Sequence, residues 1–156
     1  MMIIGQMEMF AMLTLCLGIS LLGCSCSTMK PLRYGVGVIN GGSVKIVVEP
    51  FDIAEGPHST VAVGQVNPGG TAGMSPFYRR PVERVTVAWR IYSTGEKGQA
   101  VVWPELPKEF TKAGGSTIFL RIFPEKQQIK VFYEILDPKT GRISVIRQSD
   151  YSSPGE

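Results

Sequence analysis

Few residues in this chain could carry out catalysis, and they form no recognised pattern. His58 is the only histidine among 156 residues, whereas Ser-His-acid and Cys-His mechanisms both require an imidazole as the general base. It lies in the stretch AEGPHST, whose turn-forming residues indicate an exposed loop. A single histidine also excludes the usual histidine-rich zinc sites. The sequence therefore predicts neither a metal centre nor a bound cofactor.

Pairs of carboxylates are the remaining route to catalysis, because glycoside hydrolysis needs two of them at a set separation. The glycine-rich stretch NPGGTAGMS (67–75) has no lysine after it and no helix to precede, so it does not predict a phosphate-binding loop. We expect a protein that is not an enzyme, and a cell-wall enzyme that uses two carboxylates is kept as an alternative. Nothing in the sequence spacing identifies two of the candidate carboxylates as a catalytic pair. The candidates are Asp52, Glu55, Glu83, Glu105 and Glu109.

The segment 67–81 is a more natural candidate, for binding rather than catalysis. It contains aromatic, methionine and arginine residues among glycines and prolines, and such side chains on a mobile loop are favoured at protein interfaces. Two interpretations stay open for Phe77, which either contacts a partner or closes the open end of the core. The predicted partner-binding residues are Phe77, Tyr78, Arg79 and Arg80.

A second candidate for binding is VVWPELPKEF (101–110), in which Trp103, Leu106 and Phe110 are spaced by prolines. The alternative interpretation is a rigid loop packed on the core. Nucleic-acid binding is not expected, because the net charge is only +3 and the 16 Lys and Arg residues are scattered among 13 acidic ones.

Alternation of apolar and polar residues predicts strands to position these segments. The clearest example is VERVTVAWRIY (82–92), where Val85, Val87, Trp89 and Ile91 share one face. Asn40-Gly41-Gly42 is typical of a hairpin turn between two further strands at 36–38 and 44–48. Other strands are expected at 61–66, 100–103, 118–122, 129–135 and 143–145.

These seven or eight short strands, separated by Gly- and Pro-containing turns, predict an all-β fold. No part of 33–147 shows a convincing helical period. We expect a single antiparallel β-sandwich, immunoglobulin-like, over 33–147.

The N-terminal segment places this domain in the cell. FAMLTLCLGISLL (10–22) is a mostly apolar run of 13 residues. As a helix it would span about 20 Å, which is shorter than the ~30 Å hydrocarbon core of a membrane and typical of a signal peptide. Leu21-Leu22-Gly23-Cys24 resembles the lipobox of bacterial lipoproteins, in which a small residue precedes the modified cysteine. The alternatives are an uncleaved anchor and a soluble protein with an apolar N-terminus.

The resemblance to lipoproteins implies that Cys24 carries a diacylglycerol, that the chain is cut before it, and that the new N-terminus is acylated, as with palmitate. Residues 1–23 are then a signal peptide, 24–32 a lipidated tether and 148–156 a disordered tail. Ser25 follows the cysteine where an aspartate would signal the inner membrane, so we expect the outer membrane, facing the periplasm. Cys26 would be the single free thiol, which excludes an intramolecular disulfide.

The chain also bears a likeness to small Gram-negative lipoproteins, some of which are thought to be immunity proteins against type VI secretion phospholipase effectors. The likeness rests on GVGVINGGSVKIVV, VTVAWR and IFLRIFPEKQQIKVFYEI. We expect a membrane-anchored periplasmic lipoprotein that acts as a non-catalytic protein-binding module, as an inhibitor or immunity protein. Its partner would be an envelope or effector protein. A structural lipoprotein of the envelope or of a secretion assembly is the alternative.

Overall fold

The computed structural model describes residues 32–111, 116–137 and 139–152, and this part of the chain is all-β. It contains no α-helix, and its two 3₁₀ helices, η1 (Lys108–Thr111) and η2 (Pro124–Lys126), are too short to cross a membrane. The strands are β1 (Tyr34–Asn40), β2 (Ile46–Val48), β3 (Phe51–Asp52), β4 (Thr60–Val61), β5 (Gly64–Val66), β6 (Thr71–Phe77), β7 (Val85–Ile91), β8 (Lys97–Val102), β9 (Ser116–Phe123), β10 (Gln128–Leu136) and β11 (Ile143–Ser152).

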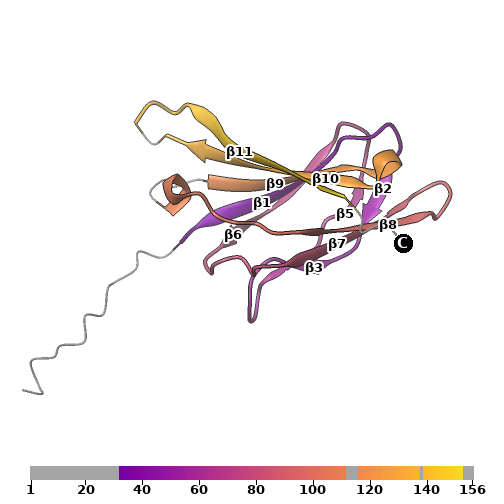
Figure 1. Cartoon of the computed structure of the whole chain (residues 1–156), viewed down its shortest axis with the longest axis horizontal. Helices are drawn as coiled ribbons and strands as arrows, with labels where there is room; N and C mark the ends of the chain where they lie inside the picture. Colours follow the sequence, from indigo (N-terminus) through magenta and orange to yellow (C-terminus); the bar gives the residue numbers. More distant parts are fainter. Residues whose placement is uncertain (1–31, 112–115, 138, 153–156) are drawn as a thin grey trace, which may run out of the picture. The chain divides into compact units, whose positions relative to one another are not determined.

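These strands form three open sheets (Figure 1). A five-stranded sheet has the order β11-β10-β9-β1-β6, a four-stranded sheet has the order β5-β2-β7-β8, and β3 pairs with β4. All pairs are antiparallel except β1 and β9, which run parallel with Tyr34 opposite Ser116 and Asn40 opposite Ile122. The expectation of a wholly antiparallel arrangement is wrong at this pair. A parallel pair requires a long crossover, and the strands of the four-stranded sheet lie within the chain that connects β1 to β9.

The predicted alternation is confirmed where it was clearest. Val85, Val87 and Trp89 of β7 are buried, while Thr86 and Arg90 are exposed. The same period buries alternate residues of β9 and β10, and both larger sheets contribute to one hydrophobic core. The largest side chains that are fully buried in it are Trp89, Tyr34, Tyr133 and Phe110.

The predicted hairpin at 40–42 is wrong, because β1 and β2 belong to different sheets. The backbone instead turns a corner after Asn40, and the Asn40 side chain is fully buried at this corner. Its Nδ2 donates to the carbonyl of Val44 at 2.7 Å and to that of Val66 at 3.0 Å, and its Oδ1 accepts from the Gly42 amide at 3.0 Å. The amide therefore satisfies backbone groups at the point where the chain passes from one sheet to the other.

The segment 67–81 is also not the mobile loop that its glycines suggested. Residues 71–77 form β6, an edge strand that pairs with β1, with Phe77 opposite Tyr34 and Gly73 opposite Gly37.

Two further boundaries differ from expectation. The strand predicted over 61–66 is interrupted, since Gly64 has a φ of 74°, and it becomes β4 and β5. At the C-terminal end β11 continues to Ser152 along β10, so the ordered chain extends beyond the expected limit at 147. The predicted signal peptide and Cys24 lie outside the described residues.

Candidate protein-binding site

The predicted binding residues lie where the chain leaves the five-stranded sheet, at the end of β6. The chain after Phe77 then runs beside the segment that follows β3. The Val82 amide donates to the carbonyl of Ile53 at 2.9 Å, and Ala54 and Pro81 form an isolated antiparallel bridge. The position of Tyr78, Arg79 and Arg80 is therefore determined by backbone contacts at both ends of the segment.

Phe77 belongs to the core and not to the surface. Its ring is only 6% exposed and is stacked on Tyr34, with the ring centroids 5.8 Å apart. Of the two interpretations of Phe77, the structure therefore supports the one in which it closes the end of the core. Its side chain cannot contact a partner in this conformation.

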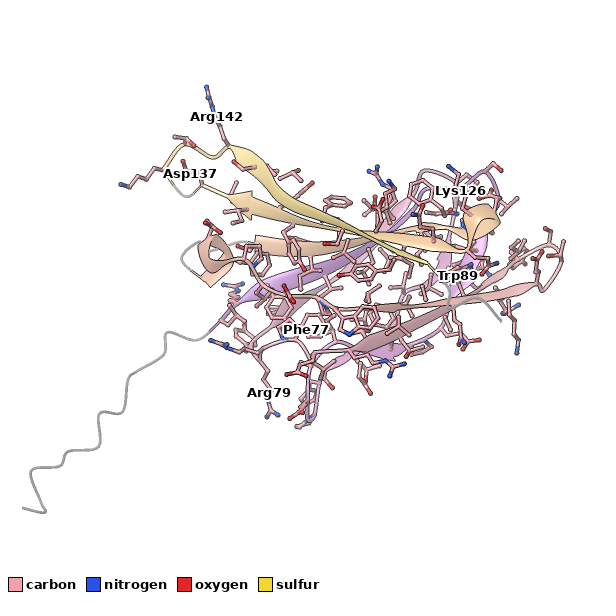
Figure 2. All side chains as sticks on the ribbon, in the orientation of Figure 1. Phe77, Arg79, Trp89, Lys126, Asp137 and Arg142 are labelled. Atoms are coloured by element: carbon pink, nitrogen blue, oxygen red, sulfur yellow. The ribbon has the colours of Figure 1, made fainter. Side chains whose placement is uncertain are left out.

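Tyr78 and Arg79 lie at the surface. The Tyr78 side chain is 58% exposed. Arg79, which Figure 2 shows at the surface, donates a hydrogen bond from its guanidinium to the carbonyl of Glu55 at 2.9 Å. This bond orients one end of the guanidinium and holds it against the turn at 54–59. Arg80 is exposed next to it.

The turn at 54–59 has a backbone that allows this contact. Gly56 has a φ of 87°, and a Cβ at this position would collide with the Arg79 guanidinium. His58 has a φ of 61°, which is uncommon for a residue with a side chain. Ser59 closes the turn by donating from Oγ to the carbonyl of Gly56 at 2.6 Å. Glycine at position 56 is thus needed both for the turn and for the close approach of Arg79.

Two shallow hollows flank Arg79. The first, of about 370 Å³, is mostly apolar and is lined by residues that include Pro57, His58, Pro76 and Tyr78. The second, of about 490 Å³, is more polar and is lined by Glu55, Arg79, Arg80, Pro81, Val82 and Glu83. An aromatic side chain and two cations therefore surround an apolar and a polar depression, which is an arrangement typical of protein interfaces.

The structure brings together only some of the residues that were considered for catalysis. His58 is exposed in its turn, as predicted. Glu55 and Glu83 line the same hollow, but they share it with two arginines. Asp52 instead hydrogen-bonds with the hydroxyl of Thr60 on β4. Across the described ranges, no three His, Cys, Asp or Glu residues are placed to hold a metal ion.

The second predicted candidate, at 101–110, is divided between core and surface. Phe110 is buried against Tyr34 and Tyr133, with centroid distances of 6.0 Å and 5.8 Å. Trp103 is 47% exposed and is packed on Tyr151, whose hydroxyl donates to the Trp103 carbonyl at 2.9 Å. This segment therefore agrees best with the alternative of a loop packed on the domain.

Sequence reasoning did not find the part that the turn at 54–59 plays in the site. The Gly-Pro pair at 56–57 indicates a turn, but it does not indicate that this turn contacts Arg79. Comparisons of this chain with family models, with curated proteins and with solved structures gave no match.

Proposed function

We propose that the protein is a membrane-anchored periplasmic lipoprotein that acts as a non-catalytic protein-binding module, as an inhibitor or immunity protein. The anchor is the lipid on Cys24, and the outer membrane is its expected location. The observation that carries the binding role is the exposure of Tyr78 next to Arg79 and an apolar hollow. Large aromatic side chains and arginine contribute most to protein interfaces, particularly beside a concave surface.

The immunoglobulin-like sandwich is part of this proposal. It is supported by two larger sheets of mostly antiparallel strands that bury their side chains in one core. In such folds, the loops at the ends of the sheets are common binding sites. Tyr78, Arg79 and Arg80 occupy this kind of position, immediately after an edge strand.

The binding role is tested by capturing partners from envelope extract with the full chain and with a variant that carries Tyr78→Ala, Arg79→Ser and Arg80→Ser. Phe77 is left unchanged because its removal would damage the core. The matched control is Tyr92→Ala, which removes a tyrosine of similar exposure, 52% against 58%. We expect the triple variant to lose a partner that the wild type and the control retain. Equal capture by all three would exclude this surface.

The anchor is tested separately by the intact mass of the membrane-extracted protein. We expect a chain that begins at Cys24 and carries lipid, and a Cys24→Ala variant that is neither lipidated nor cleaved. A wild-type chain that still begins at Met1 would remove the lipoprotein assignment.

A further inference from the structure

The hairpin of β10 and β11 carries an unusual group of exposed apolar side chains. Leu136 is 37% exposed, Ile143 63% and Val145 61%. Among the residues whose side-chain exposure the structure describes, they are the only exposed large aliphatic ones. Leu136 is opposite Ile143, and Val145 lies two residues further along β11, so all three share the face of the sheet that is turned away from the core.

Several hydrogen bonds join the described residues of this turn. The Asp137 amide donates to the carbonyl of Arg142 at 2.9 Å, and the Asp137 carboxylate accepts from the Lys139 amide and the Thr140 hydroxyl, both at 2.8 Å. These bonds lower the pKa of Asp137 and turn its carboxylate inward on the loop. Lys139 and Arg142 remain exposed, and Figure 2 shows Arg142 projecting from the tip. Two exposed cations thus flank the apolar group, and Glu134, which is opposite Val145, lies on the same face.

The strand register places this tip at the end of the sheet where the domain begins. Tyr34 is opposite Ser116 at the start of β9, and Thr117 is opposite Glu134 near the end of β10. The starts of β1, β9 and β11 and the end of β10 therefore lie together. Since neighbouring strands are about 4.8 Å apart, β10 lies roughly 10 Å from β1. Figure 1 shows the tip of the hairpin at the same end of the sheet as the start of β1.

The stretch between Cys24 and the domain is short. Nine residues lie between Cys24 and Tyr34, and the ten Cα–Cα steps that join them span at most about 35 Å. If Cys24 carries the lipid, the end of the domain that is closest to the membrane along the chain is the end with the exposed apolar tip. Apolar side chains next to lysine and arginine suit the boundary between headgroups and acyl chains, where the cations can extend to the phosphates.

We propose that the β10–β11 tip is a second membrane contact, in which Leu136, Ile143 and Val145 insert into the lipid surface and Lys139 and Arg142 contact the headgroups. This inference rests on the proposed lipid anchor. The contact orients the domain on the bilayer, with the far end of the sheets directed away from it. Tyr78 follows Phe77, which is opposite Tyr34, so the candidate binding site lies at the same end of the domain, near the other edge of the sheet. Its partner would therefore bind close to the membrane.

The test compares two variants that are expressed from the full sequence and lipidated, in vesicles of phosphatidylcholine and phosphatidylglycerol that contain brominated acyl chains. Ile143→Trp places a tryptophan at the tip. Tyr92→Trp places one at the opposite end of the domain, where the Tyr92 amide bonds to the carbonyl of Lys45 near the Asn40 corner. We expect quenching of the added fluorescence to be at least about two-fold greater at position 143, because an inserted apolar group lies ~5–10 Å below the surface. Adding Val145→Asp should reduce it.

Flotation of the vesicles measures the anchor independently. A protein that floats but shows equal quenching at both positions overturns the tip contact and leaves the lipoprotein assignment intact. A protein that does not float overturns both. If detergent-solubilised wild type forms dimers that Val145→Asp dissociates, and no quenching occurs, the tip binds a second copy of the chain and the membrane contact is wrong.

Discussion

The ring of Phe119 on β9 covers Gly37 on β1, its direct partner in the parallel pair. A Cβ at position 37 would lie 2.5 Å from Cδ1 of that ring. The ring is also stacked on Phe132 of β10, with centroids 5.2 Å apart and planes at 14°. The outer face of the five-stranded sheet thus has an aromatic pair that occupies the space left free by glycine.

Gly37→Ala should therefore destabilise the protein, although alanine is normally preferred to glycine in strands. Overpacking of this kind costs about 1–3 kcal/mol, measured by urea unfolding. The control is Gly73→Ala on the same rung of β6, where a Cβ would meet only ordinary contacts, the nearest at 3.4 Å. The cost of Gly37→Ala should fall in a Phe119→Leu background. If it does not, the ring is not its cause.

Asn40 should be among the polar residues on which stability depends most. Asn40→Ala leaves the buried carbonyl of Val66 and the amide of Gly42 without their side-chain partner. Each of these two groups costs ~1–3 kcal/mol when it is left unsatisfied, so we expect a loss of about 2–6 kcal/mol. Asn67→Ala is the control, since Asn67 is exposed. Equal melting temperatures for the two variants would contradict the role of Asn40 at the corner.

The strands whose two faces differ in polarity could be predicted from the sequence. The direction of the backbone could not be predicted where the hydrogen bonds of a single side chain determine it. In β7, β9 and β10 the alternation is long enough to determine which face is buried. At Asn40-Gly41-Gly42 the same residues suit a tight turn and a corner, and only the distant carbonyl of Val66 decides between them. The sequence of the strand at 71–77, TAGMSPF, shows no alternation of apolar and polar residues, and its place in the sheet comes from its pairing with β1.

The exposure of the predicted binding residues could be predicted only in part. Tyr78, Arg79 and Arg80 are exposed, as interface residues must be. Phe77 and Tyr78 are both aromatic and adjacent, so the sequence does not separate them. Phe77 is buried because side chains of a strand alternate between its two faces and because Phe77 is opposite Tyr34. The pairing of β6 with β1 decides this, and the sequence did not indicate that pairing.

Trp89 should contribute strongly to stability and Trp103 weakly. Trp89 is 1% exposed, and Trp103 is 47% exposed. Trp89→Ala should cost ~3–5 kcal/mol in the free energy of unfolding, as for other large buried side chains. Trp103→Ala serves as the comparison, because it keeps the carbonyl that accepts from Tyr151. Chemical denaturation of both variants measures the difference. A Trp89→Ala protein as stable as wild type would contradict the placement of Trp89 in the core.

Tyr34 should make the protein sensitive to alkaline pH. Burial raises the pKa of its phenol above the ordinary value of 10.0, and its hydroxyl has no hydrogen-bond partner among the described residues. The native state therefore keeps the proton where the unfolded state loses it. The contribution to stability is complete below pH ~10 and declines as the pH rises above that value.

The variant Tyr34→Phe removes this titration and the unpaired hydroxyl. We expect it to be as stable as wild type at neutral pH, or more stable, since no hydrogen bond is lost. Above pH ~10 its melting temperature should fall less steeply than that of wild type. Parallel pH curves for the two proteins would show that Tyr34 does not cause the alkaline loss.

At the candidate site, Tyr78 and Arg80 should affect different rate constants once a partner has been captured. Tyr78 supplies contact area beside an apolar hollow, so Tyr78→Ala should mainly raise the dissociation rate, and we expect ~30-fold weaker binding, which corresponds to about 2 kcal/mol. Arg80 is an exposed charge next to the polar hollow. Arg80→Gln should therefore slow association and make it less dependent on salt, with little effect on dissociation. Surface plasmon resonance at two salt concentrations separates these effects, with Tyr92→Ala as the control. A Tyr78→Ala variant that dissociates no faster than this control would place the interface elsewhere on the domain.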